Sequence, residues 1–184
     1  IGIRIAEVLA DTMPFMLSAA AVMAVVAAGC GGGVTVDTID EREWMRLIEL
    51  NLNSVFRFTM TVLPIMRAKK CGKIVNISSG AGITGDFSDP HYAAAKGGII
   101  GMTQDLAAYM APYGVRVNCI SPGGFDKGDL PEAFTKAYGA ATPLGRMGKM
   151  GEEIKGAALF LASEASHYVT GHNLAVDGGF HVCK

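Results

Sequence analysis

Gly72-Lys73-Ile74-Val75-Asn76-Ile77-Ser78-Ser79 is the stretch that decides the fold. Its short apolar run at 74–77 predicts a strand, and a helix is expected from about 91 to 110. Further strands are expected at 115–120 and 173–176, and further helices at about 40–66, preceded by Asp40 as a possible cap, and at 152–163. This alternation predicts an α/β fold with a doubly wound parallel sheet and helices on both faces. Ligands then bind beyond the carboxyl ends of the strands, where Ser79 lies.

Tyr92 and Lys96 lie four residues apart in His-Tyr-Ala-Ala-Ala-Lys-Gly-Gly, thirteen residues after Ser79. At this spacing a phenol and an ammonium share one helix face. The cation favours phenolate and lowers the tyrosine pKa from its ordinary value of roughly 10, so Tyr92 is a candidate proton donor or acceptor near neutral pH. A serine hydroxyl beside it would hold a substrate oxygen. The three residues together indicate carbonyl–alcohol redox chemistry.

Each residue also has an alternative structural explanation. Tyr92 and Lys96 can form an ordinary amphipathic pair with a snorkelling lysine. Ser79 can satisfy backbone groups at the end of a strand, where serine is common. Asn51 falls inside a predicted helix, where asparagine competes for backbone hydrogen bonds and is mildly unfavourable. A functional use for Asn51 would explain that cost.

From Asp37 to Phe180 the chain resembles the short-chain dehydrogenase/reductase family. The resemblance rests on ordered motifs at the family's spacing: Asn51 in Glu-Leu-Asn-Leu-Asn, the serine strand, Tyr92-x-x-x-Lys96, Pro122-Gly123, and the closing stretch 169–179. It implies that Tyr92 exchanges a proton, Ser79 positions the oxygen, Lys96 lowers the tyrosine pKa and holds the nicotinamide ribose, and Asn51 holds a relay water. A hydride would pass between NAD or NADP and the substrate.

The cofactor half departs from the family's pattern. Gly2 and Ile3 resemble the end of its glycine-rich phosphate loop, but the two strand–helix units that should follow are replaced by residues 11–26. Ala28 and Gly29 stand where Asn-Asn-Ala-Gly is expected. We therefore expect one domain over 1–184, with an incomplete dinucleotide-binding part at 1–36, N-terminal strands missing, and a catalytic and substrate part at 37–184.

Further cofactor contacts are expected from Pro122, Gly123 and Phe125. The family usually places a threonine in this loop, whereas this chain has Gly-Phe-Asp-Lys at 124–127. Preference between NAD and NADP is not readable, because the residue that selects it belongs to the missing region.

Composition excludes several other classes of protein. A net charge of −1, 50% hydrophobic residues and the absence of a basic tract argue against a nucleic-acid binder or a disordered chain. The four cysteines have no Cys-x-x-Cys spacing and the four histidines form no His-x-x-x-His motif, so we expect no metal, reduced thiols and a cytoplasmic location. The uncharged stretch 12–36 is long enough to span a bilayer. Pro14 and the glycines at 29–33 favour instead a breaker and a loop around a buried strand at 22–27, and no membrane partner is expected.

The substrate is expected to contact residues 124–138, read as a mobile flap or as a plain surface loop. The tail resembles relatives that act on sugars, sugar acids and polyols. Two apolar helices, with Met60, Met66, Met102 and Met110, predict a homo-oligomer or simply fill the core. The alternative function is a catalytically impaired relative that acts as a binding or scaffold subunit.

Overall fold

The computed structural model describes residues 23–26, 35–85 and 89–183 of the 184-residue chain. In this part, a parallel sheet has the strand order β1-β2-β3-β6, formed by Met23–Val26, Gly72–Ile77, Val115–Pro122 and Asn173–Val176. The register pairs Val25 with Val75, Val75 with Asn118 and Ile120 with Leu174. The predicted parallel sheet is confirmed, and the strand predicted at 173–176 has the predicted bounds.

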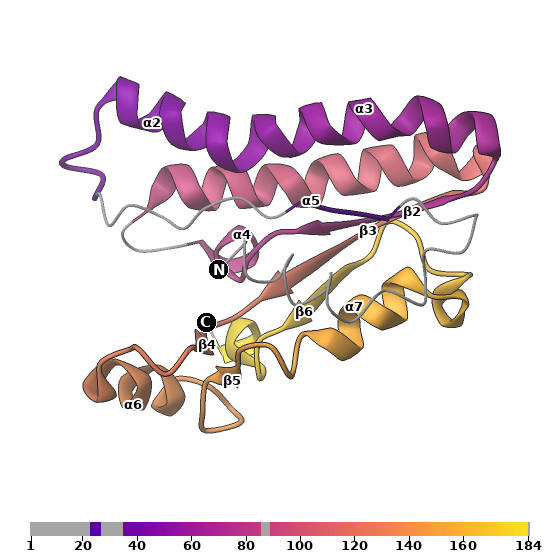
Figure 1. The fold of residues 1–184 in the computed structure, drawn as a ribbon. Helices are drawn as coiled ribbons and strands as arrows, with labels where there is room; N and C mark the ends of the chain where they lie inside the picture. The colour runs from indigo at the N-terminus through magenta and orange to yellow at the C-terminus, as the bar shows by residue number, and fades with distance from the viewer. Residues whose placement is uncertain (1–22, 27–34, 86–88, 184) are drawn as a thin grey trace.

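Helices cover both faces of the sheet (Figure 1). On one face lie α2 (Glu41–Ile48), α3 (Ser54–Lys69) and α5 (Pro90–Met110), and on the other lies α7 (Lys155–Ala162). The short α4 (Ala81–Thr84), together with α6 (Glu132–Ala140), β4 (Phe125–Asp126) and β5 (Gly148–Lys149), gathers at the end where the strands finish. Single turns of 3-10 helix are η2 (Ala111–Tyr113), η3 (Glu164–Ser166) and η4 (Phe180–Cys183).

The strands are apolar on both faces because both faces are covered. Ile74 and Val117 pack with α3 and α5, in a cluster that includes Met66 and Met110. Val75, Ile77 and Ile120 point the other way and pack with Phe125 and the α7 residues Ala158 and Leu161. Met66 and Met110 therefore fill the core, whereas Met60 is exposed.

The predicted helix at 40–66 divides into three parts. Asp40 caps α2, since its carboxylate accepts the Glu43 backbone N–H at 2.7 Å, as predicted. Between α2 and α3 the chain makes one π-helical turn, η1 (Glu49–Asn53), closed by a bond from Ser54 N–H to the Glu49 carbonyl. Inward-facing residues of α3 then follow helical spacing from Val55 through Thr59, Val62 and Leu63 to Met66. Phe56 and Phe58 lie beside this row and are about half exposed.

Two polar side chains of β3 fasten α7 and β6 to the sheet. The Arg116 guanidinium donates to the carbonyls of Val169 and Ser163 at 3.1 and 2.9 Å, beyond the end of α7. Asn118 donates to the Val169 carbonyl and accepts the His172 backbone N–H. Both residues belong to the Arg-Val-Asn stretch, whose polar groups are thus satisfied inside the fold.

The described residues also bear on the predictions about a membrane span, a metal site and the cysteines. Within the described ranges, no helix has both the length and the apolar character to cross a membrane, and no cluster of His, Cys, Asp and Glu has the arrangement of a metal site. Cys119 and Cys183 are free thiols. The proposed phosphate-loop residues Gly2 and Ile3, the residues Ala28 and Gly29, and most of the stretch 12–36 lie outside the described residues.

Candidate active site

Ser79 lies at the carboxyl end of the sheet because the chain continues the parallel pairing beyond β2. Ser78 N–H donates to the Ile120 carbonyl at 2.8 Å, and Gly80 N–H donates to the Pro122 carbonyl at 2.9 Å. Ser79 lies between these two bonds and is half-buried. Its Oγ accepts the Ala81 backbone N–H at 3.2 Å, which fixes the hydroxyl at the start of α4. The same pairing brings Ser79 beside the Pro122-Gly123 turn.

Tyr92 and Lys96 occupy the first two turns of α5, which begins at Pro90, a residue that suits a first helical position. The Lys96 Nζ lies 5.5 Å from the centre of the Tyr92 ring. Lys96 is only 1% exposed, and its ammonium donates to the carbonyl of Ile77, the last residue of β2, at 3.1 Å. The cation therefore lies between the Tyr92 ring and the strand end that leads to Ser79. The structure brings together the three residues that the sequence predicted.

Burial lowers the pKa of Lys96 to about 8, against a partial opposing effect from the nearby Cys119. Cys119 is buried as well, and burial raises the pKa of its thiol to about 12. At neutral pH the site thus holds a protonated lysine above a neutral thiol. An ammonium buried this deeply stabilises negative charge on a neighbouring oxygen more strongly than an exposed lysine would.

Contacts that the sequence analysis missed hold α4 against α5. Ser78 Oγ donates to the Lys96 backbone carbonyl at 2.7 Å. Gly82 lies so close that a Cβ there would be 2.7 Å from the Lys96 carbonyl carbon and 2.8 Å from Ser78 Oγ. The glycine after Ser-Ser-Gly-Ala was the available signal for this close approach. Together these contacts fix the distance between the Ser79 segment and the lysine.

Asn51 lies in the π-helical turn η1 and is fully buried. Its amide donates to the Leu47 carbonyl at 3.2 Å, and its Oδ1 has no hydrogen-bond partner within the described residues. The turn packs on α5 two residues beyond Lys96, where a Cβ on Gly98 would meet the Leu52 side chain at 3.0 Å. An unpaired buried oxygen of this kind is a position that an ordered water commonly fills.

The Pro122-Gly123 turn follows β3, and Gly123 N–H donates to the Val176 carbonyl at 3.0 Å. Phe125 was predicted to contact the cofactor. Its ring is instead buried in the core between the sheet and α7, against Gly148, so that only its backbone remains for such a contact. Residues 132–138 were read as part of a flap or a plain loop, but they are helical and begin α6. The plain-loop alternative is therefore wrong for them.

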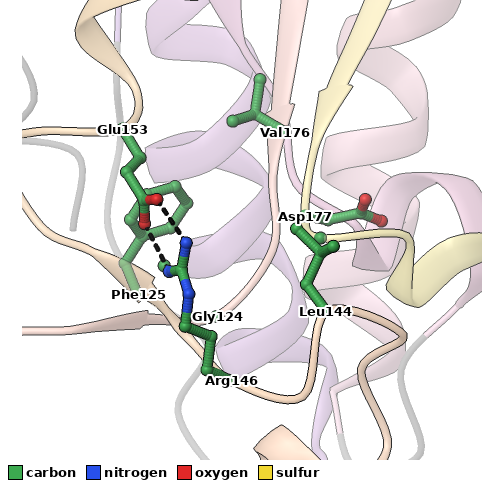
Figure 2. A pocket seen from close by; sticks show the side chains of 9 residues that line it. Gly124, Phe125, Leu144, Arg146, Glu153, Val176 and Asp177 are labelled. Carbon is green, nitrogen blue, oxygen red and sulfur yellow. Dashed lines mark hydrogen bonds and ion pairs between the residues drawn. The ribbon is translucent and has the colours of Figure 1, made fainter.

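A cavity of about 120 Å³ lies next to the Pro122-Gly123 turn (Figure 2). Gly124, Phe125, Val176 and Asp177 contribute to its wall. On its side, the Arg146 guanidinium and Glu153 carboxylate form two hydrogen bonds of 2.7 and 2.6 Å. These bonds, with one from the Lys149 backbone, lower the pKa of Glu153 to about 2. The two charges thus neutralise each other, and the ion pair fastens the loop that precedes β5.

Comparisons with known proteins agree with this arrangement. A family model described as enoyl-(acyl carrier protein) reductase matches residues 7–181. The 3-oxoacyl-[acyl-carrier-protein] reductase of Thermotoga maritima is 41% identical over 154 residues, which cover 80% of this chain and 62% of the relative. The corresponding protein of Salmonella typhimurium is 39% identical over 158 residues, with 82% and 64% covered. The chain spans less than two thirds of the length of these curated relatives.

Solved structures share the fold. A gluconate 5-dehydrogenase from Burkholderia cenocepacia, in complex with NADP and tartrate, has a TM-score of 0.83 and 34% identity, with 96% of this chain and 71% of that chain covered. A short chain dehydrogenase from Leptospira borgpetersenii with bound NAD+ has a TM-score of 0.81 and 34% identity, with 96% and 70% covered.

Proposed function

The chain belongs to the short-chain dehydrogenase/reductase family, and from this membership we propose that the protein transfers a hydride between NAD or NADP and a small alcohol or carbonyl compound. The observation that carries the proposal is the position of Lys96. Its buried ammonium lies over the Tyr92 ring and is bonded to the last carbonyl of the strand that leads to Ser79. A structural lysine that snorkels to solvent would not be held in this way.

A nicotinamide dinucleotide fits the described part of the site. An ammonium has three donors, and in the described residues Lys96 Nζ makes one hydrogen bond, to the Ile77 carbonyl. Its other donors are therefore suited to ribose hydroxyls. Pro122 and Gly123, at the carboxyl end of β3, would lie along the nicotinamide. The bound nicotinamide would supply or accept the hydride.

The side chains have distinct roles in this proposal. Tyr92 gives a proton to the carbonyl oxygen during reduction and takes it back during oxidation. The Lys96 ammonium favours the phenolate form of Tyr92, which brings its pKa towards neutrality. The Ser79 hydroxyl donates to the same substrate oxygen and holds it beside the phenol. Asn51 Oδ1, buried and unpaired in the described residues, holds a water that resupplies protons towards Lys96.

Replacement of Tyr92 by Phe tests this assignment. We expect Tyr92→Phe to lose at least about 100-fold in turnover, the lower range for loss of a general acid, while its circular dichroism and its NADH affinity stay close to wild type. Tyr168→Phe is the matched control, because Tyr168 is 96% exposed and outside the site. Retained activity in Tyr92→Phe would contradict the mechanism.

A binding or scaffold subunit is the alternative function, favoured by the departures from the family pattern in residues 1–36. Fluorescence titration of the wild-type chain with NADH and NADPH separates the two. Saturable binding supports the oxidoreductase, whereas no binding of either supports the scaffold role.

Two substrate classes follow from the similar proteins. The structural neighbours include gluconate dehydrogenases, and we propose a sugar acid, sugar or polyol as the substrate. The curated relatives named as 3-oxoacyl reductases favour a 3-oxoacyl thioester as the second candidate. Assays of gluconate and polyol oxidation, run beside reduction of an acetoacetyl thioester, would rank them. The proposal includes a homo-oligomer located in the cytoplasm.

A further inference from the structure

The C-terminal turn of the chain is organised around the buried carboxylate of Asp177, which directly follows β6. Its Oδ1 accepts the Gly179 N–H at 3.0 Å, and its Oδ2 accepts the His181 N–H at 2.9 Å. The same Oδ2 lies 2.7 Å from His181 Nδ1. Burial disfavours the charged carboxylate, but the hydrogen bonds from His181 and Gly179 outweigh it and lower the pKa of Asp177. An ionised Asp177 requires that Nδ1 carry the proton and donate it.

Phe180, between these residues, connects the turn to α6. Its ring stacks on the Tyr138 ring with centres 4.7 Å apart and planes 6° from parallel. Tyr138 Oη in turn accepts the backbone N–H of Gly124 at 2.7 Å. Burial raises the pKa of Tyr138, so its hydroxyl stays protonated over the working pH range. One chain of contacts therefore runs from His181 through Phe180 and Tyr138 to Gly124.

The turn at Gly123 and Gly124 is held on one side by these residues. A Cβ on Gly123 would lie 2.6 Å from the Asp177 Cβ, and one on Gly124 would lie 2.6 Å from the Tyr138 ring. Gly124 and Asp177 also line the cavity of about 120 Å³ (Figure 2). The turn is therefore not enclosed by the core, and it is held by its close contacts with Asp177 and Tyr138.

We propose that Asp177, Phe180, His181 and Tyr138 form a clasp that sets the position of the Gly123–Gly124 turn, with His181 as a positioning residue for cofactor binding. The link to cofactor rests on the proposed function, in which this turn lies along the nicotinamide. The clasp itself is proposed for the protein without cofactor. His181 acts by locking Asp177 and Phe180, and it does not touch the reacting atoms.

Amide hydrogen exchange of the full chain without cofactor tests the clasp directly. His181→Leu removes the Nδ1 donor, and we expect exchange over 123–126 to quicken by roughly tenfold, the scale for loss of one hydrogen bond to a charged acceptor. His181→Asn places an amide donor where Nδ1 lies and should restore wild-type protection. Tyr138→Phe should also quicken exchange of Gly124, because its acceptor is gone. Val182→Ala, at an adjacent exposed residue, is the matched control.

The strand β2 reports whether the whole fold has weakened. The clasp requires that exchange over 72–77 stay unchanged in His181→Leu. Equal quickening over 72–77 and 123–126, or no quickening in either, would overturn the proposal.

Steady-state kinetics test the link to the cofactor. In His181→Leu we expect KM for NADH or NADPH to rise severalfold with a smaller change in kcat, and His181→Asn to reverse the rise. An unchanged KM would refute the positioning role. If the wild type binds neither nucleotide, the proposed function fails, while the exchange data still decide on the clasp.

Discussion

Lys96 makes the charge of the candidate site depend on pH, because burial brings its pKa to about 8. In the unfolded chain this amine has an ordinary lysine pKa, so between these values the unfolded state binds more protons. Stability from this group is therefore fully present above the unfolded pKa and is lost as pH falls through the folded value. We expect the urea midpoint of wild type, relative to Lys96→Met, to rise from about pH 7 to about pH 9.

The pH range of this experiment ends below the values at which the Cys119 thiol affects stability. Its pKa is raised in the fold, which gives the opposite slope only above the ordinary thiol value of 9.0. A constant difference between wild type and Lys96→Met over the range would show that the lysine is hydrated in the folded protein.

Ser79 allows chemistry to be separated from local structure by a matched pair of variants. Ser79 Oγ accepts the N–H two residues ahead, and Ser163 Oγ makes the same bond to Ala165 far from the site. Both changes to Ala should cost about 1 kcal/mol or less of stability. Ser79→Ala alone should lower kcat, by roughly 10- to 1000-fold, since one donor to the reacting oxygen is lost. Equal kcat in the two variants would remove Ser79 from the mechanism.

The grouping of Tyr92, Lys96 and Ser79 could be predicted because their signals are local. Tyr92 and Lys96 share one helix face by their spacing alone, and Ser79 follows a recognisable strand. Tyr138 and Phe180 could not be predicted, because each acquires its contact from a segment distant in sequence. The burial of the Phe125 ring could not be predicted for a related reason: its residue type does not reveal that β4 turns the ring into the core.

The contact between α4 and α5 is the element-scale feature that sets the geometry of the site. In Gly82→Ala the new Cβ meets backbone atoms of Lys96 and Gly97, which cannot rotate away. We expect a loss of about 1–3 kcal/mol in unfolding free energy and a lower kcat, measured by urea denaturation and steady-state assays. Gly101→Ala on α5 is the control, since no atom lies within 4 Å of its Cβ. That change should stabilise the protein by up to about 1 kcal/mol. Equal stability of the two variants would argue against the tight contact.

The apolar pattern predicted which segments are strands and which are helices, but it predicted their ends less accurately. The helix predicted at 152–163 is shorter, Lys155–Ala162, because residues 151–154 form turns. The π-helical turn around Asn51 had no signal in residue type, since the same residues are compatible with an ordinary α-helix. It follows from packing, because Leu47, Asn51 and Val55 are all buried in the fold.

At the scale of the whole molecule, α3 presents apolar side chains to solvent. Phe56 and Met60, which lie four residues apart and so share one side of the helix, are 48% and 46% exposed. A face of this kind is typical of a subunit interface, which accords with the proposed homo-oligomer. We expect Met60→Glu to lower the mass measured by light scattering after gel filtration. Tyr168→Glu, at an exposed residue elsewhere, should leave it unchanged. A wild type that is already monomeric would contradict the proposal.

The layered architecture was predictable as a whole because parallel sheets need apolar strands and a helix on each face. The site's placement at the carboxyl end followed from that topology. The N-terminal part could not be treated in the same way, since 1–22 and 27–34 lie outside the described residues.

The π-helical turn between α2 and α3 limits how the chain can gain or lose residues. Its hydrogen bonds span five residues where those of an α-helix span four, so a one-residue deletion within Glu49–Asn53 would close it as an ordinary α-turn and keep the row that begins at Val55 in the core. The exposed loop around Gly128 has no such coupling to the core. Between Asp40 and Lys69, relatives should therefore differ in length by this one residue or not at all, whereas larger length differences should accumulate near Gly128.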